Sequence, residues 1–220
     1  MGTCCRTSAD VGTRLSIPAS RPSSLLGEGL DGTVFGVKPL LGQAAAIAEQ
    51  HLAGALPRRW QHVRHVAAKA RRLGVLAECD QEMLEAAAWL HDIGHSPGIA
   101  ETGFHSLDGA RWLLRQGFDS RLAGLVAHHS CASFEAKERG FGETLDSEFA
   151  REESATADAL WYADMTTGPD GQEFTIEERL AEIRERYGPD HLVTRFWRKA
   201  EPVLVEAARR TQARISAQPM

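Results

Sequence analysis

From Leu40 to near its C-terminal end, the sequence is a succession of segments whose apolar residues recur every three or four positions. This spacing is typical of amphipathic α-helices, and helix start and stop signals bound several of the segments. Asp80 is a predicted N-cap and Gly94 a predicted stop for one segment, and Thr175 with Glu178 forms a predicted capping box for another. No segment alternates apolar and polar residues over a convincing length, so the pattern predicts an all-α helical bundle. We expect helices at 40–56, 57–74, 81–94, 104–117, 120–130, 154–165, 176–188 and 190–215.

The first 36 residues differ from the rest because they are rich in Gly, Ser, Thr and Pro and have no sustained apolar period. We expect residues 1–36 to form a flexible, disordered tail and residues 37–216 to form one domain. A chain of 220 residues with 43% hydrophobic and 25% charged residues is long enough for one sizeable core.

Charge and cysteine content narrow the expected partners and compartment. The formal net charge of −5 argues against a nucleic-acid polymer as the main partner. The chain lacks a run of about 18 apolar residues, the length that a membrane helix needs, so we expect no membrane span. The four cysteines have no C-x-x-C spacing and follow no signal-peptide segment, which favours a cytoplasmic location. The sequence does not indicate an oligomeric state.

Seven of the nine histidines lie between His62 and His129, close to the ends of predicted helices. A divalent metal site needs imidazole nitrogens and carboxylate oxygens that converge from separate rigid elements. His91 and Asp92 supply one of each at the end of an alanine-rich apolar segment. The partial negative charge of a helix C-terminus also favours a cation there. The histidines are therefore interpreted together, as candidates for a metal site.

Three motifs carry a resemblance to a known family. The segments R-W-Q-H-V-R-H-V at 59–66, H-D-I-G at 91–94 and W-Y-A-D-M-T at 161–166 resemble the H…HD…D pattern of the HD superfamily of metal-dependent phosphohydrolases. The resemblance covers roughly residues 45–200 and implies an HD-domain helical bundle. It also implies that one metal ion is held by His62, His91, Asp92 and Asp164.

Two further segments, F-H-S-L-D-G-A-R-W-L-L at 104–114 and L-V-A-H-H-S at 125–130, resemble the additional histidines of superfamily members that hold two metals. The resemblance implies that Asp92 bridges to a second ion, which His105 and His128 also hold. His129 is the alternative to His128, because helical phase does not decide between neighbours. We expect two divalent metal ions, with Fe, Mn or Co favoured.

His95 follows the H-D-I-G motif at a position where many hydrolases of this superfamily have lysine. That lysine can hold a substrate phosphate, whereas histidine is shorter and less reliably cationic. We consider two roles for His95, either a catalytic contact to a substrate phosphate alongside Asp92 or a cap of the helix C-terminus.

The resemblance implies hydrolysis of a phosphate ester or anhydride by attack of a metal-bridging hydroxide. We expect a small phosphorylated substrate, a nucleotide or dinucleotide. Diiron oxygenases of the same fold share the H…HD…H…H…D ligands, so cleavage of a C–C or C–P bond is an alternative, and a non-catalytic domain that binds metal or a nucleotide is another. The polar stretch 130–153 is either a specificity element, with Phe134 and Phe141 near the pocket, or a solvated connection.

Overall fold

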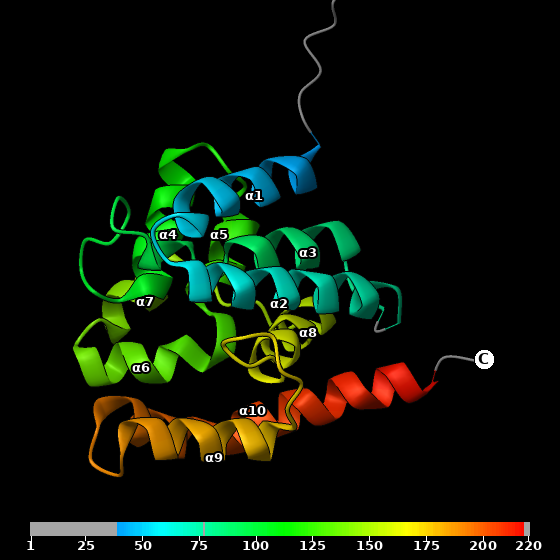
Figure 1. Cartoon of the computed structure of the whole chain (residues 1–220), viewed down its shortest axis with the longest axis vertical. Helices are drawn as coiled ribbons and strands as arrows, with labels where there is room; N and C mark the ends of the chain where they lie inside the picture. Colours follow the sequence, from blue (N-terminus) through cyan, green and yellow to red (C-terminus); the bar gives the residue numbers. More distant parts are fainter. Residues whose placement is uncertain (1–38, 77, 218–220) are drawn as a thin grey trace, which may run out of the picture. The chain divides into compact units, whose positions relative to one another are not determined.

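A computed structural model describes residues 39–76 and 78–217, which form an all-α bundle (Figure 1). The described residues contain no strand, only an isolated β-bridge between Thr167 and Glu173, so the expected fold class is confirmed. The tail expected at 1–36 lies outside the described residues. The helices and short helical turns are α1 (Leu40–Ala48), η1 (Glu49–Ala53), α2 (Pro57–Leu76), α3 (Gln81–Leu90), η2 (Ile93–His95), α4 (His105–Arg115), α5 (Ser120–Ala127), η3 (His129–Cys131), α6 (Ala132–Arg139), α7 (Gly142–Glu148), α8 (Ala155–Met165), α9 (Ile176–Tyr187) and α10 (Leu192–Ala217).

Side-chain caps explain where several helices begin. Asp80 accepts a hydrogen bond from the backbone nitrogen of Met83 at the start of α3. Thr175 and Glu178 form the predicted capping box at the start of α9. Each cap satisfies backbone N–H groups that have no partner within the helix.

The core forms where α2, α3 and α8 pack together, and Figure 1 shows α2 and α3 side by side. Ala86, Ala87 and Ala88 of α3 are fully buried, and their small side chains let neighbouring helices approach closely. α10 packs against α8 and α6, and α9 lies along α10. Among the described helices, none is long and apolar enough to cross a membrane.

A buried lysine fastens the end of α8 to α2. Lys69 Nζ donates to the carbonyl oxygen of Thr166 at 2.7 Å and to its Oγ1 at 2.8 Å, and it pairs with Glu173 at 2.5 Å. Burial lowers the pKa of Lys69, and the Glu173 carboxylate opposes that shift. Because Thr166 follows Asp164 by two residues, this anchor holds Asp164 close to α2.

The stretch 130–153 differs from the expected polar connection because it contains α6 and α7. Gly140 ends α6 at φ 80°, a left-handed conformation that glycine adopts without steric cost. Phe134 and Phe141 pack against the core, and the Phe141 ring stacks on that of Phe104 with centroids 6.1 Å apart. These two aromatic rings therefore support the fold.

Candidate metal centre

The end of α3 presents the H-D-I-G motif inside the bundle. His91 caps α3, and Asp92 follows in a turn with φ −100° and ψ 8°. Gly94 then passes so close to α4 that a Cβ on it would lie 2.0 Å from the carbonyl oxygen of His105. Only glycine permits this approach, which places His105 against the motif.

The first candidate group joins α2, the end of α3 and α8. One ligand atom from each of His62, His91 and Asp92 lies within 4.8 Å of the others, and all three residues are buried. Asp164 completes the group, because its Oδ1 lies 3.0 Å from His62 Nε2 and 3.7 Å from His91 Nε2. The structure thus brings together the four residues expected for a first metal.

The second candidate group consists of Asp92, His105 and His129, whose ligand atoms also lie within 4.8 Å of one another. The two carboxylate oxygens of Asp92 face different groups. Oδ2 lies 3.3 Å from His91 Nε2, whereas Oδ1 lies 3.5 Å from His105 Nε2. A carboxylate in this orientation can bridge two metal ions.

The structure places His129, the alternative considered above, in the second group, and places His128 away from it. His128 Nε2 lies 2.9 Å from the carbonyl oxygen of Phe149, and no atom of His128 belongs to either candidate group. After His129 the backbone turns through left-handed conformations at Ser130 (φ 45°) and Cys131 (φ 60°). The helix has already ended at His128, so helical phase does not determine the orientation of the two imidazoles.

Backbone carbonyls fix the orientation of three imidazoles, and this arrangement fits metal ligands. Nδ1 of His62, His91 and His129 lies 3.1, 2.8 and 2.6 Å from the carbonyl oxygens of Gly168, Ala88 and Val126. Because a carbonyl only accepts, each Nδ1 donates, and Nε2 faces the centre of the group. His91 Nε2 is buried with no hydrogen-bond partner among the described residues. This nitrogen is therefore available to a metal ion. His128 Nδ1 is also buried without a hydrogen-bond partner among the described residues, but no atom of His128 belongs to either candidate group.

Burial and neighbouring charges set the protonation of the two groups. Burial lowers the pKa of His105 and His129, which favours the neutral imidazoles that bind metals. Burial also lowers the pKa of His91, but the carboxylates of Asp92 and Asp164 outweigh it and raise that pKa to about 9. The pKa of Asp92 lies well below its usual range, because Arg59 and His91 overcome the opposing effect of burial.

Two residues at the centre were missed by the sequence analysis. Arg59 Nη1 donates to Asp92 Oδ2 at 2.6 Å, and Ser130 Oγ donates to Asp164 Oδ2. Arg59 precedes His62 by three positions in α2, so both lie on one face of the helix. This spacing in the sequence could have identified Arg59 as a neighbour of the metal ligands. Ser130 gave no such signal, since only the turn after His129 directs it inward.

A cavity of about 210 Å³ opens over both groups. His95 lies at its wall, with Nε2 3.6 Å from Asp92 Oδ1 and its ring stacked on that of His105 at 4.0 Å. Burial lowers the pKa of His95 to about 4. A neutral His95 can contact substrate but lacks the positive charge of a lysine. The other lining residues include Arg59, Arg139, Arg179, Arg186, Glu135, Tyr187, Phe196 and Trp197.

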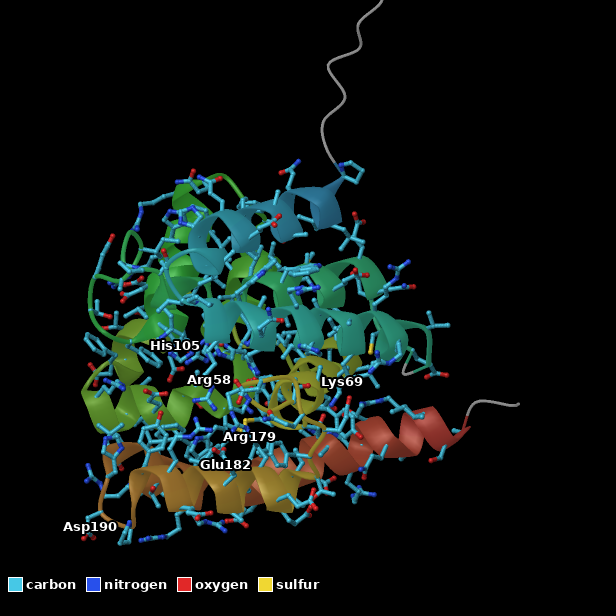
Figure 2. The ribbon with its side chains drawn as sticks, viewed as in Figure 1. Arg58, Lys69, His105, Arg179, Glu182 and Asp190 are labelled. Carbon is cyan, nitrogen blue, oxygen red and sulfur yellow. The ribbon has the colours of Figure 1, made fainter. Side chains whose placement is uncertain are left out.

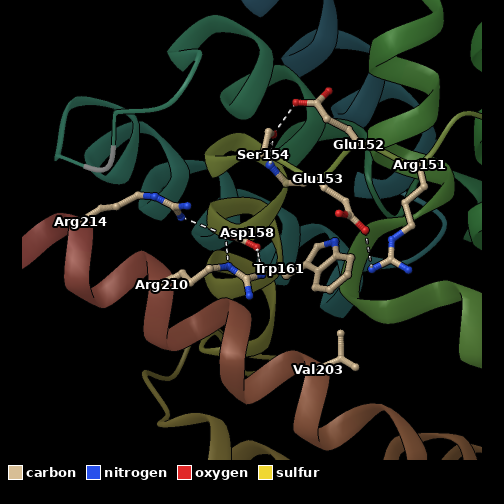
Figure 3. Close-up of a pocket in the computed structure, with 10 residues that line it drawn as sticks. Arg151, Glu152, Glu153, Ser154, Asp158, Trp161, Val203, Arg210 and Arg214 are labelled. Carbon is tan, nitrogen blue, oxygen red and sulfur yellow. Dashed lines mark hydrogen bonds and ion pairs between the residues drawn. The ribbon is translucent and has the colours of Figure 1, made fainter.

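A larger cavity of about 400 Å³ lies elsewhere, between α8 and α10 (Figure 3). Asp158 is central to it and binds Arg210 and Arg214. None of the candidate metal ligands lines this cavity. Its charged groups already have partners of opposite charge, including Arg121 outside the cavity for Glu152, so we assign it a structural role.

Comparison with known protein families agrees with this geometry. The family model described as "HD domain" matches residues 59–187, more than half of the chain. The chain therefore belongs to the HD domain family, whose members are generally metal-dependent hydrolases. No curated protein and no solved structure matches the chain.

Proposed function

We propose that the protein is a metal-dependent phosphohydrolase with a two-metal site, acting on a small phosphorylated molecule. One observation carries the proposal: Asp92 directs Oδ2 toward His91 and Oδ1 toward His105, so that one carboxylate serves both candidate groups. A site for a single structural metal does not need a second set of ligands on the other side of a shared carboxylate.

The donor set suits divalent ions of the iron, manganese or cobalt kind, because it combines imidazole nitrogens with carboxylate oxygens. His62, His91, Asp92 and Asp164 would hold one ion, and Asp92, His105 and His129 the other. When bound, such a pair of ions polarises phosphoryl oxygens and lowers the pKa of water between them.

Residues around the two groups would orient the ligands and the substrate. Arg59 holds Asp92 in place through its hydrogen bond to Oδ2, and its side chain is 39% exposed at the cavity. Ser130 fixes Asp164 in the same way from η3. His95 stands next to Asp92, and the single N–H group of its neutral ring can donate one hydrogen bond to a phosphate oxygen.

The cavity suggests the size and charge of the substrate. A volume of about 210 Å³ accommodates a small molecule or one end of a larger one. Four arginines in its lining suit phosphate groups, since the guanidinium donors match phosphate oxygens. The net charge of −5 fits a small anionic substrate bound by a local patch better than it fits a nucleic-acid polymer. A nucleotide or dinucleotide meets these conditions.

The test measures phosphate release from nucleotides and from p-nitrophenyl phosphate by the full chain loaded with Mn²⁺ or Co²⁺. The variant Asp92→Ala should lose at least about 100-fold in activity, because both groups lose their shared ligand. The control Asp146→Ala removes an exposed carboxylate of α7 and should keep full activity. Full activity in Asp92→Ala, or no turnover of any phosphate compound by the metal-loaded wild type, would contradict the proposal.

A specific observation keeps an oxygenase as a second candidate. The group of Asp92, His105 and His129 contains two histidines and one carboxylate, a combination that also serves non-haem iron oxygenases. Oxygen consumption by the iron-loaded protein with candidate substrates distinguishes the two activities, because hydrolysis needs no oxygen.

A further inference from the structure

Helix α9 contributes two arginines to the candidate metal cavity from outside the metal motif. Arg179 and Arg186 are seven residues apart and therefore lie on the same face of α9. Both line the cavity over the metal ligands. Both also line an adjoining cavity of about 380 Å³, which shares Arg59 and His62 with the first. In Figure 2, Arg179 lies between α9 and the neighbouring Arg58 of α2.

Glu182 binds the guanidinium groups of both Arg179 and Arg186. It lies three residues after Arg179 and four before Arg186, so it reaches both along the helix. Its Oε2 accepts a hydrogen bond from Arg179 Nη1, and its Oε1 accepts one from Arg186 Nη2. Glu182 lines neither cavity. One carboxylate thus orients two guanidinium groups, and the pair keeps an excess positive charge at the cavity.

The donors of Arg179 are not all used. Its side chain is only 11% exposed, and its buried Nε has no hydrogen-bond partner among the described residues. A buried N–H group of a charged side chain without an acceptor is costly unless something else supplies one. Glu182 therefore leaves hydrogen-bonding capacity on Arg179 unused, and Arg179 lines both cavities.

The other three arginines of the two cavities are engaged differently, and one of them, Arg59, donates to Asp92 at 2.6 Å. Arg58 forms a two-pronged pair with Asp170, with both N···O distances 2.8 Å. Arg139 pairs with the buried Glu135, which lines the cavity itself. Each of these arginines therefore has a carboxylate of its own, whereas Arg179 and Arg186 share one.

We propose that Arg179 and Arg186 form an anion subsite that binds a second phosphate group of the substrate, beyond the phosphate at the metal ligands. The substrate class is then a molecule with at least two phosphate groups, such as a nucleoside diphosphate or triphosphate. The identity of the anion as part of a substrate rests on the phosphohydrolase function proposed above, whereas anion binding by α9 does not.

The test uses the full chain freed of metal with a chelator and inorganic pyrophosphate as the probe, with binding measured by titration calorimetry. The double variant Arg179→Gln/Arg186→Gln should bind pyrophosphate at least about tenfold more weakly than the wild type, because charge-assisted hydrogen bonds are lost. The single variant Arg186→Gln should show an intermediate loss, and it serves if the double variant does not fold. Arg184→Gln is the matched control, since Arg184 lies on α9 but pairs with Glu201 and lines neither cavity.

Equal pyrophosphate affinity in the wild type and in a folded double variant would overturn the proposal, as would an equal loss in Arg184→Gln. In the Mn²⁺-loaded enzyme, the double variant should raise KM for a nucleoside diphosphate by a larger factor than KM for p-nitrophenyl phosphate, which has no second phosphate group. If the wild type binds pyrophosphate through α9 but hydrolyses no phosphate compound, the subsite stands and the proposed hydrolysis fails. If the double variant still hydrolyses phosphate compounds and binds pyrophosphate as the wild type does, the subsite fails and the proposed hydrolysis stands.

Discussion

The Nε2 atoms of His105 and His129 lie 3.2 Å apart, although α4 supplies one and the turn after α5 supplies the other. Burial lowers the pKa of both imidazoles, so both are neutral at physiological pH. Both also lie near Asp92, with which their ligand atoms fall within 4.8 Å. Two neutral ring nitrogens this close to each other and to one carboxylate are arranged to share a cation.

Metal affinity should increase with pH. His91 has a pKa of about 9 in the metal-free protein, because Asp92 and Asp164 outweigh the lowering effect of burial, and it must lose its proton to bind a metal. Below that pKa the proton competes, so apparent affinity should rise by up to about tenfold per pH unit and level off above about pH 9. Zn²⁺ titrations between about pH 6.5 and 8 measure the slope.

The matched control for this slope is His65→Ala, which removes an exposed imidazole of α2 that lines neither cavity over the metal ligands. It should leave the pH dependence unchanged. A pH-independent affinity in the wild type would contradict competition between a proton and a metal ion at His91.

Replacement of Gly94 by alanine should destabilise the protein by about 3 kcal/mol or more, because the new Cβ would overlap the backbone of α4. The nearest atoms are the carbonyl oxygen of His105 at 2.0 Å and the nitrogen of Gly109 at 2.7 Å, and backbone cannot rotate away. Gly98→Ala, in the same connection, meets no atom within 4 Å and should have little effect. Denaturant unfolding measures both, and equal stability of the two variants would refute the close approach.

Removal of the Asp158 carboxylate should lower the stability of the protein without affecting the metal centre. Its side chain is 10% exposed and accepts two hydrogen bonds from Arg210 and one from Arg214, which fixes the end of α10 on α8 (Figure 3). We expect Asp158→Ala to cost about 2 kcal/mol of unfolding free energy and to leave metal content unchanged. Thermal unfolding with metal analysis tests both parts.

The control Glu206→Ala removes an exposed carboxylate of α10 that pairs with Arg209 and Arg210, and we expect no measurable change in stability. Loss of metal from a folded Asp158→Ala protein would assign the cavity between α8 and α10 a role at the metal centre.

Much of the fold follows from local signals in the sequence. The caps at Asp80 and Thr175 identify helix starts, because each side chain satisfies backbone groups within its own turn. The helices in 130–153 were missed because their apolar side chains are few, and their stability comes from packing of Phe134 and Phe141 on the core.

Some residues of the candidate metal centre also follow from the sequence, whereas others depend on tertiary packing. His62, His91, Asp92, His105 and Asp164 were expected from their motifs and lie together. The choice of His129 over His128 depends on a left-handed turn that only tertiary packing supports, and sequence periodicity carries no information about it. The sequence likewise does not predict that Arg179 and Arg186 line the cavity, because α9 reaches it only through long-range packing.

The most direct test of the two-group centre is metal content by elemental mass spectrometry on protein purified without oxygen, for the wild type, His129→Ala and His128→Ala. The geometry predicts about two metals per chain in the wild type and in His128→Ala, and about one in His129→Ala. Loss of a metal from His128→Ala with both retained in His129→Ala, or one metal in all three proteins, would contradict a second ion held by Asp92, His105 and His129.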